Sequence, residues 1–156
     1  MTNPTPFPSE MHAGMLIRRP PHVVYAAFVD PAVTTKFWFT HASSRLEAGK
    51  TTRWEWRMYG VGDDVKCLAL TPNARIEIEW NSTAPNRVTW EFLPHAGNTF
   101  VRIINTGFSG DPGSIASKII DSTQGFNLVL AGAKAWLEHG IELNLVLDIH
   151  PAGLAD

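Results

Sequence analysis

The chain has 156 residues, of which 44% are hydrophobic and 18% charged, and its formal net charge is −2. These values exclude a disordered chain and are typical of one globular domain. The small net charge and the lack of a basic run argue against nucleic acid or an anionic membrane as a partner. The single cysteine, Cys67, excludes an intramolecular disulfide, and a reducing cytoplasm is the compartment we expect.

The two ends of the chain differ from its middle. Residues 1–10, MTNPTPFPSE, combine three prolines with no apolar run, which predicts a flexible leader and neither a signal peptide nor a membrane span. No segment approaches the ~20 consecutive apolar residues that a membrane span needs. We expect a single domain over residues 11–150, with residues 151–156 as a tail.

The first predicted elements are a strand and two short helices. Residues 11–19, MHAGMLIRR, can form the strand. The next stretch, PPHVVYAAFVDP, offers prolines for a helix start and Asp-Pro for its end. A second short helix is expected over residues 31–36, and a strand near residues 44–47.

The middle of the chain predicts an antiparallel meander. Its strand segments, separated by turn signals, are 51–59, 65–70, 75–81, 87–93 and 99–106. Alternation with a period of two is clearest in RIEIEW and RVTWEF, and the short loops imply one solvated face. Residues 60–64 are interpreted as a break between strands, with Asp63 and Asp64 as turn residues.

One long helix is predicted near the C-terminus. From about residue 114 to 140, apolar residues recur at steps of three, four and seven. A helix of this length, roughly 40 Å, is the only element that could cover the apolar face of the sheet. The segment after it could add a helical turn or a short strand. The fold class is therefore α+β: a curved antiparallel sheet of about six to seven strands around a long C-terminal helix, with two short helices after the first strand.

Several stretches occur in a specific order along the chain. They are PPHVVYAAFVDPAVTTKFW, LEAGK, LTPNARIEIEW, NTFVRIINTGF and GFNLVLAGAKAWLEHG. Over about residues 15–140 the chain resembles the START-like (SRPBCC) superfamily, which has the helix-grip or birch-allergen-like fold. Within it, the chain resembles the family related to the activator of heat-shock chaperone ATPase. The resemblance implies a cavity between sheet and helix for apolar or aromatic small molecules.

The relatives that this resemblance implies have different functions. The sequence also differs from theirs at two positions. They include lipid carriers, polyketide cyclases and stimulators of a chaperone ATPase, and fold alone does not choose among these. The family often has Gly-Trp where this chain has Gly125-Phe126, and many relatives have histidine where it has Asn105. The chaperone stimulator also carries a second domain, for which 156 residues leave no room.

Large aromatic side chains share one face of the predicted sheet. Trp54, Trp56 and Met58 alternate with charged residues in TTRWEWRMYG, so they point to the apolar face. They could fill the core by themselves or line a ligand cavity. We expect packing near the N-terminal half of the long helix and an opening at the other end. The candidate ligand-binding residues are Trp38, His41, Trp54, Trp56, Met58, Ile78, Trp80, Trp90, Phe92, Asn105, Phe126 and Leu130.

Among these candidates, two are polar. Asn105 has inward parity, so its amide needs a hydrogen-bond partner, either the backbone, a water or a ligand carbonyl or hydroxyl. His41 follows KFWFT near the expected cavity mouth, and a surface histidine is the alternative.

Two glycines, Gly125 and Gly132, lie seven residues apart on the predicted long helix. They are either tolerated glycines or positions that leave room for tryptophans or a ligand. In the second case, Gly132→Leu is predicted to keep or raise the melting temperature and abolish ligand binding.

The sequence offers little for catalysis. No histidine pair has metal-binding spacing, and no G-x-S-x-G or dinucleotide fingerprint occurs, so no metal, cofactor or catalytic residue is assigned. Cys67 is interpreted as a small buried hydrophobe. We favour a protein that binds an apolar or aromatic small molecule. A polyketide cyclase-like enzyme and a protein that stimulates a chaperone ATPase are the alternatives, and a homodimer is compatible with each.

Overall fold

The computed structural model describes residues 8–152 and 154. Its elements in chain order are β1 (Met11–Ile17), α1 (Pro21–Val29), α2 (Pro31–Thr34), β2 (His41–Ala42), β3 (Thr51–Trp56), the 3-10 turn η1 (Arg57–Tyr59), β4 (Val61–Thr71), β5 (Arg75–Trp80), β6 (Asn86–His95), β7 (Asn98–Thr106), α3 (Pro112–His139) and α4 (Leu145–Asp148).

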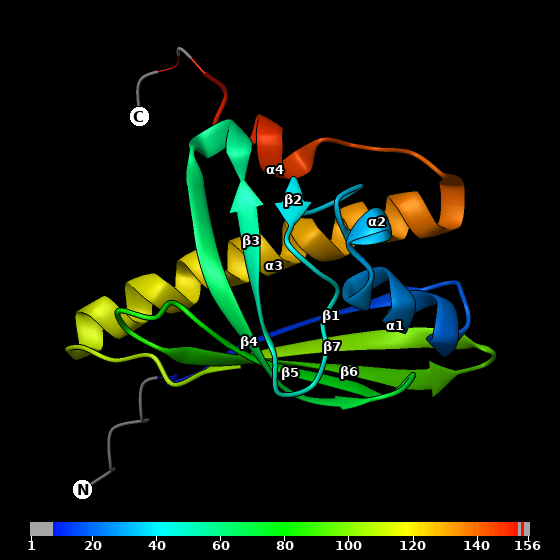
Figure 1. Cartoon of the computed structure of the whole chain (residues 1–156), viewed down its shortest axis with the longest axis horizontal. Coiled ribbons are helices and arrows are strands. Elements are labelled where there is room, and N and C mark those ends of the chain that lie inside the picture. Colours follow the sequence, from blue (N-terminus) through cyan, green and yellow to red (C-terminus); the bar gives the residue numbers. More distant parts are fainter. Residues whose placement is uncertain (1–7, 153, 155–156) are drawn as a thin grey trace, which may run out of the picture.

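All seven strands form one sheet in the order β1-β7-β6-β5-β4-β3-β2, and every neighbouring pair is antiparallel. Figure 1 shows the sheet curving around α3, which crosses its concave side. The predicted α+β fold, with a curved antiparallel sheet and a long C-terminal helix, is confirmed.

The long helix α3 has well-defined ends. The Asp111 carboxylate accepts a hydrogen bond from the Ser114 amide at 2.9 Å, and Pro112 occupies the first helical position, where a missing N–H costs nothing. Gly140, with φ of +66°, ends the helix in the left-handed conformation that favours glycine. The helix therefore begins two residues before the predicted start at 114 and ends where the sequence indicates.

The two short helices follow the first strand as predicted. The carboxylate of Asp30 caps α2 by accepting a hydrogen bond from the Ala32 amide at 3.0 Å. The second helix ends at Thr34, earlier than the predicted residue 36.

Two strand boundaries were predicted incorrectly. The segment at 44–47 is not a strand, although Leu46 is buried, and β2 lies instead at His41–Ala42. The break expected at residues 60–64 is also wrong, because η1 and the left-handed Gly60 (φ +63°) reverse the chain earlier. Asp63 and Asp64 are consequently strand residues of β4 and not turn residues.

The C-terminal segment folds back as a helix and not as a strand. After Gly140 the chain leads to α4, and the carbonyls of Val146 and Leu147 accept hydrogen bonds from the Tyr59 hydroxyl of η1. Most of the predicted leader, residues 1–7, and tail residues 153, 155 and 156 lie outside the described residues. None of the helices in the described part of the chain is both long enough and apolar enough to cross a membrane.

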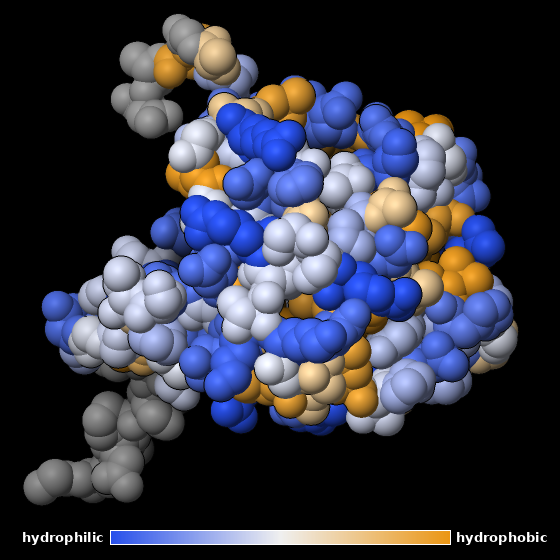
Figure 2. All heavy atoms as spheres, in the orientation of Figure 1, coloured by the Kyte–Doolittle hydropathy of each residue, from blue (hydrophilic) through white to orange (hydrophobic). Residues whose placement is uncertain are grey.

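The core lies between the sheet and the C-terminal half of α3. Trp54 and Trp90 are each 1% exposed, and Leu130 and Ala133 of α3 are fully buried against the same cluster. The Trp90 indole nitrogen is the one buried side-chain polar atom without a partner among the described residues. On the face shown in Figure 2, apolar residues are dispersed among hydrophilic ones.

Candidate ligand-binding site

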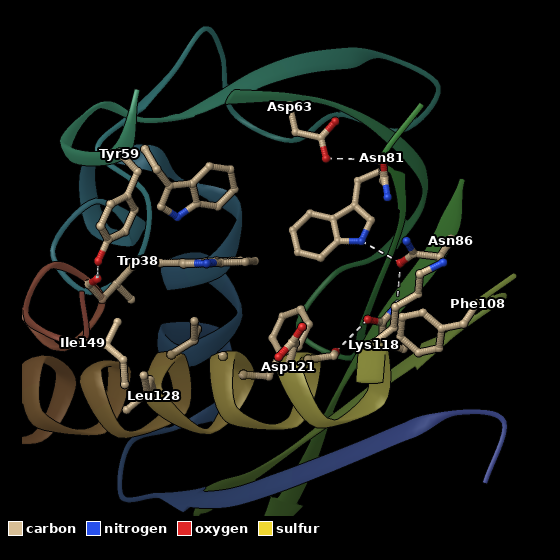
Figure 3. A pocket seen from close by; sticks show the side chains of 18 of the residues that line it. Trp38, Tyr59, Asp63, Asn81, Asn86, Phe108, Lys118, Asp121, Leu128 and Ile149 are labelled. Carbon is tan, nitrogen blue, oxygen red and sulfur yellow. Dashed lines mark hydrogen bonds between the residues drawn. The ribbon is translucent and has the colours of Figure 1, made fainter. Parts of the chain in front are cut away.

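A cavity of about 550 Å³ lies between the N-terminal half of α3, α4 and the adjacent ends of the strands. Figure 3 shows Tyr59 and Ile149 at one end of it and Asn86, Phe108 and Lys118 at the other. The residues that line it are Trp38, Trp56, Tyr59, Asp63, Trp80, Asn81, Ala84, Asn86, Asn105, Phe108, Ser109, Lys118, Asp121, Ser122, Gly125, Phe126, Leu128, Val129, Val146, Ile149 and His150.

The cavity lies at the opposite half of the helix from the one predicted. A Cβ atom at Gly125 would meet nothing within 4 Å, so α3 faces open space at this position. A Cβ atom on Gly132 would lie 3.0 Å from the Cβ and 3.3 Å from the carbonyl oxygen of Phe37. The segment after α2 therefore packs onto the C-terminal half of α3 and leaves the cavity beside the other half.

Three tryptophans form the aromatic wall of this cavity. Trp38 makes edge contacts with Trp56 and with Trp80, at centroid distances of 6.2 and 6.1 Å and interplanar angles of 65° and 68°. Behind them, Trp54 and Trp90 lie 5.0 and 5.9 Å from Trp38 in the core. The tryptophans therefore have both proposed roles: two of them fill the core, and three line the cavity.

The predicted ligand-binding residues separate into three groups. Those that line the large cavity are Trp38, Trp56, Trp80, Asn105 and Phe126. Those that lie in the core without lining it are Trp54, Ile78, Trp90, Phe92 and Leu130.

The remaining two predicted residues lie elsewhere. Met58, which belongs to η1 and not to a strand, lines a second cavity of about 210 Å³; Trp38 and Val146 line both cavities. His41 is exposed in β2, opposite Glu55 of β3, and does not line the large cavity.

Asn105, the predicted inward amide, is satisfied within the protein. It is 2% exposed, and its amide nitrogen donates to the Arg87 carbonyl at 2.8 Å and to Oδ1 of Asn86 at 2.7 Å. Its Oδ1 accepts a hydrogen bond from the Ser122 hydroxyl at 2.8 Å. Of the partners that the sequence leaves open, a backbone carbonyl is found, together with two side chains that were not predicted.

Other cavity residues were not predicted from the sequence. Val146, Ile149 and His150 come from the C-terminal segment, whose conformation the sequence did not decide. Asn86 lies just before the predicted strand 87–93 but begins β6, where its Oδ1 also accepts a hydrogen bond from the Trp80 indole nitrogen at 2.7 Å. The only signal in the sequence that could have identified Asn86 is that a polar residue stands at the start of the alternating strand β6.

Charged groups at the cavity come from different elements. Asp63 of β4 accepts a hydrogen bond from the Asn81 backbone N–H at 2.9 Å, and Lys118 of α3 donates to the Ser109 carbonyl at 2.7 Å. Asp121 and His150 also line the wall. Within residues 8–152 and 154, no group of three or more His, Cys, Asp or Glu side chains is placed to hold a metal ion.

Cys67 lies in β4 and is fully buried, away from the cavity. Burial raises the pKa of its thiol above the ordinary value, so the nucleophilic thiolate is disfavoured. This agrees with the interpretation of Cys67 as a small buried hydrophobe.

We expect Cys67→Ala to lower the free energy of unfolding by about 1 kcal/mol, the scale of one deleted buried group. The wild-type thiol should react with a thiol reagent only on unfolding, because it is buried and protonated. Urea unfolding measures the first effect and the labelling rate in native buffer the second. Rapid labelling of the native protein would contradict this assignment.

A seven-stranded antiparallel sheet that curves around one long C-terminal helix defines the helix-grip class of the START-like superfamily. Within that class, the chain belongs to the family described as Activator of Hsp90 ATPase homolog 1-like protein, whose sequence profile matches residues 18–138. The family predicted by resemblance is thereby confirmed. No curated protein sequence matches the chain significantly.

Solved structures share the fold. Protein SSP2350 from Staphylococcus saprophyticus is 25% identical, with a TM-score of 0.75 over 86% of this chain and 95% of that one. The Aha1 dimer from Colwellia psychrerythraea is 19% identical, with a TM-score of 0.73 over 84% and 97%. DynU16, from the dynemicin biosynthetic locus, is 20% identical with a TM-score of 0.77, covering 86% of this chain but only 49% of DynU16.

Proposed function

We propose that this protein binds an apolar or aromatic small molecule in the cavity between the sheet and the N-terminal half of α3. The observation that carries the proposal is the wall of Trp38, Trp56 and Trp80 around a space of about 550 Å³. Small-molecule sites are typically concave, ~300–1,000 Å³ in volume, and mostly apolar with a few placed polar groups. The cytoplasm remains the compartment that we expect.

The preformed wall supports binding of a rigid, flat ligand. Trp38 contacts Trp54, Trp90 and Phe126 as well as its two neighbours in the wall. Side chains held by so many aromatic contacts lose little freedom when a ligand enters, which lowers the entropic cost of binding.

The alternatives rest on narrower support. A polyketide cyclase-like enzyme would need an acid–base pair at the cavity, and the titratable side chains there are Tyr59, Asp63, Lys118, Asp121 and His150. The solved Aha1 structure from Colwellia is a dimer, which is compatible with a homodimer here. A chaperone partner rests on the family alone.

The proposal is tested by titrating the protein with N-phenyl-1-naphthylamine, an uncharged aromatic dye. We expect saturable binding with one dye per chain, a dissociation constant in the micromolar range, and quenching of tryptophan fluorescence by the bound dye. Heat-unfolded protein is the control. If neither this dye nor a broad set of flat aromatic compounds binds saturably to the native protein, the proposal is wrong.

A further inference from the structure

We propose that Asn86 determines which ligands this cavity accepts, because its amide N–H groups are positioned to donate to an acceptor oxygen on the ligand. The ligand class is then a neutral aromatic molecule with a carbonyl or another acceptor oxygen. This inference rests on the proposed function and specifies it further.

The orientation of the Asn86 amide follows from Trp80. The indole nitrogen of Trp80 lies 2.7 Å from the Asn86 side chain, and an indole N–H can only donate. The atom that faces it must therefore be the amide oxygen of Asn86.

A second donor fixes the same oxygen. The Arg87 carbonyl can only accept, so the nitrogen of the Asn105 amide must face it at 2.8 Å. That nitrogen also lies 2.7 Å from Oδ1 of Asn86, while the other end of the Asn105 amide receives the Ser122 hydroxyl. The Asn86 oxygen thus accepts two hydrogen bonds. The Trp80 indole can only donate, and turning the Asn105 amide round would cost its hydrogen bonds to Arg87 and Ser122.

The amide nitrogen of Asn86 is left without a protein partner. Among the described residues, it donates no hydrogen bond, although Asn86 is half-buried and lines the cavity. Polar groups that become buried are normally paired with protein, water or ligand. A ligand that displaces water from the cavity must supply an acceptor or lose that hydrogen bond.

The surroundings define the rest of the ligand. Because the Trp80 N–H bonds to Asn86, the amide lies at the edge of the Trp80 ring, where an aromatic ligand packed on that ring would carry its substituent. Lys118 lies at the same end of the cavity and is a further donor (Figure 3). Asp63 and Asp121 also line the cavity. These two carboxylates outnumber the one lysine, Lys118, so their net negative charge disfavours an anionic ligand.

The test compares two probes of nearly equal shape, 2-acetylnaphthalene and 2-isopropenylnaphthalene, which has a methylene group in place of the carbonyl oxygen. The variant is Asn86→Asp at pH 8, where an aspartate is ionised. The carboxylate can still accept from Trp80 and Asn105, but it presents an acceptor where the wild type presents donors. The control, Asn73→Asp, makes the same change in the β4–β5 turn, away from the cavity.

We expect Asn86→Asp to weaken binding of the ketone roughly tenfold relative to the hydrocarbon, since a hydrogen bond is replaced by repulsion between two acceptors. Asn73→Asp should leave the ratio of the two dissociation constants unchanged. As a measurement that needs no variant, the carbonyl stretch of the bound ketone should lie below its frequency in cyclohexane, because hydrogen bonding weakens the C=O bond.

The outcomes separate the two proposals. If both probes bind, the ratio is the same in Asn86→Asp as in the wild type, and the carbonyl frequency matches cyclohexane, Asn86 has no such role while the binding function stands. If Asn86→Asp does not fold, the carbonyl frequency alone decides. If neither probe nor the dye binds, both proposals are wrong.

Discussion

Gly125→Leu is expected to weaken binding of the naphthylamine dye by roughly tenfold or more, equivalent to about 1.4 kcal/mol or more of lost contact, without lowering the melting temperature. A side chain at this position enters the cavity and meets no atom within 4 Å at its Cβ. Replacing glycine in a helix interior also gains about 1 kcal/mol of helix propensity. Dye titration and thermal unfolding, followed by circular dichroism, measure the two effects.

Gly125→Ala is the matched control for this change. It gives the same gain in helix propensity but adds only a methyl group, so it should keep dye binding and raise stability. If the leucine variant binds the dye as well as the alanine variant does, the ligand does not occupy the space beside Gly125.

Gly132→Leu is expected to destabilise the protein by about 2 kcal/mol, which corresponds to a loss of roughly 4–8 °C in melting temperature for a chain of this size. The new Cβ would lie 3.0 Å from the Phe37 Cβ and 3.3 Å from its carbonyl oxygen. Both atoms belong to or adjoin the backbone, so they cannot move aside as a flexible side-chain tip would. This reverses the sequence-based prediction that Gly132→Leu would be tolerated.

The same substitution at two positions isolates the packing effect. Gly125→Ala and Gly132→Ala lie on one helix and gain the same propensity, so the difference between their unfolding free energies reports the clash with Phe37. Equal stabilities would mean that α3 and the segment after α2 are less closely packed than the structure indicates.

Much of the fold could be predicted because its signals are local. The alternation in RIEIEW and RVTWEF and the apolar stripe of α3 each specify a period within one element. The start of β4 could not be predicted in this way. Gly60-Val61-Gly62 is typical of a loop, but the chain already reverses in η1 and at the left-handed Gly60. Val61 and Gly62 are therefore the first residues of β4.

The cavity was harder to predict because its position depends on contacts between distant segments. Trp54 and Trp56 share one parity, yet only Trp56 lines the cavity, since β3 ends there. Which half of α3 borders the cavity depends on the packing of Phe37 against Gly132, and these two residues are 95 positions apart in the chain. Likewise, the two side chains that bond to Asn105 come from β6, the neighbouring strand, and from α3.

The C-terminal segment forms one side of the cavity and can vary separately from the rest of the fold. The family profile ends at residue 138, whereas Val146, Ile149 and His150 reach the cavity from beyond it. The hydroxyl of Tyr59 in η1 donates hydrogen bonds to the carbonyls of Val146 and Leu147 and so holds this segment in place. Substitutions in this segment can therefore change the shape and polarity of the cavity, while the sheet and the long helix keep the sequence that folding requires.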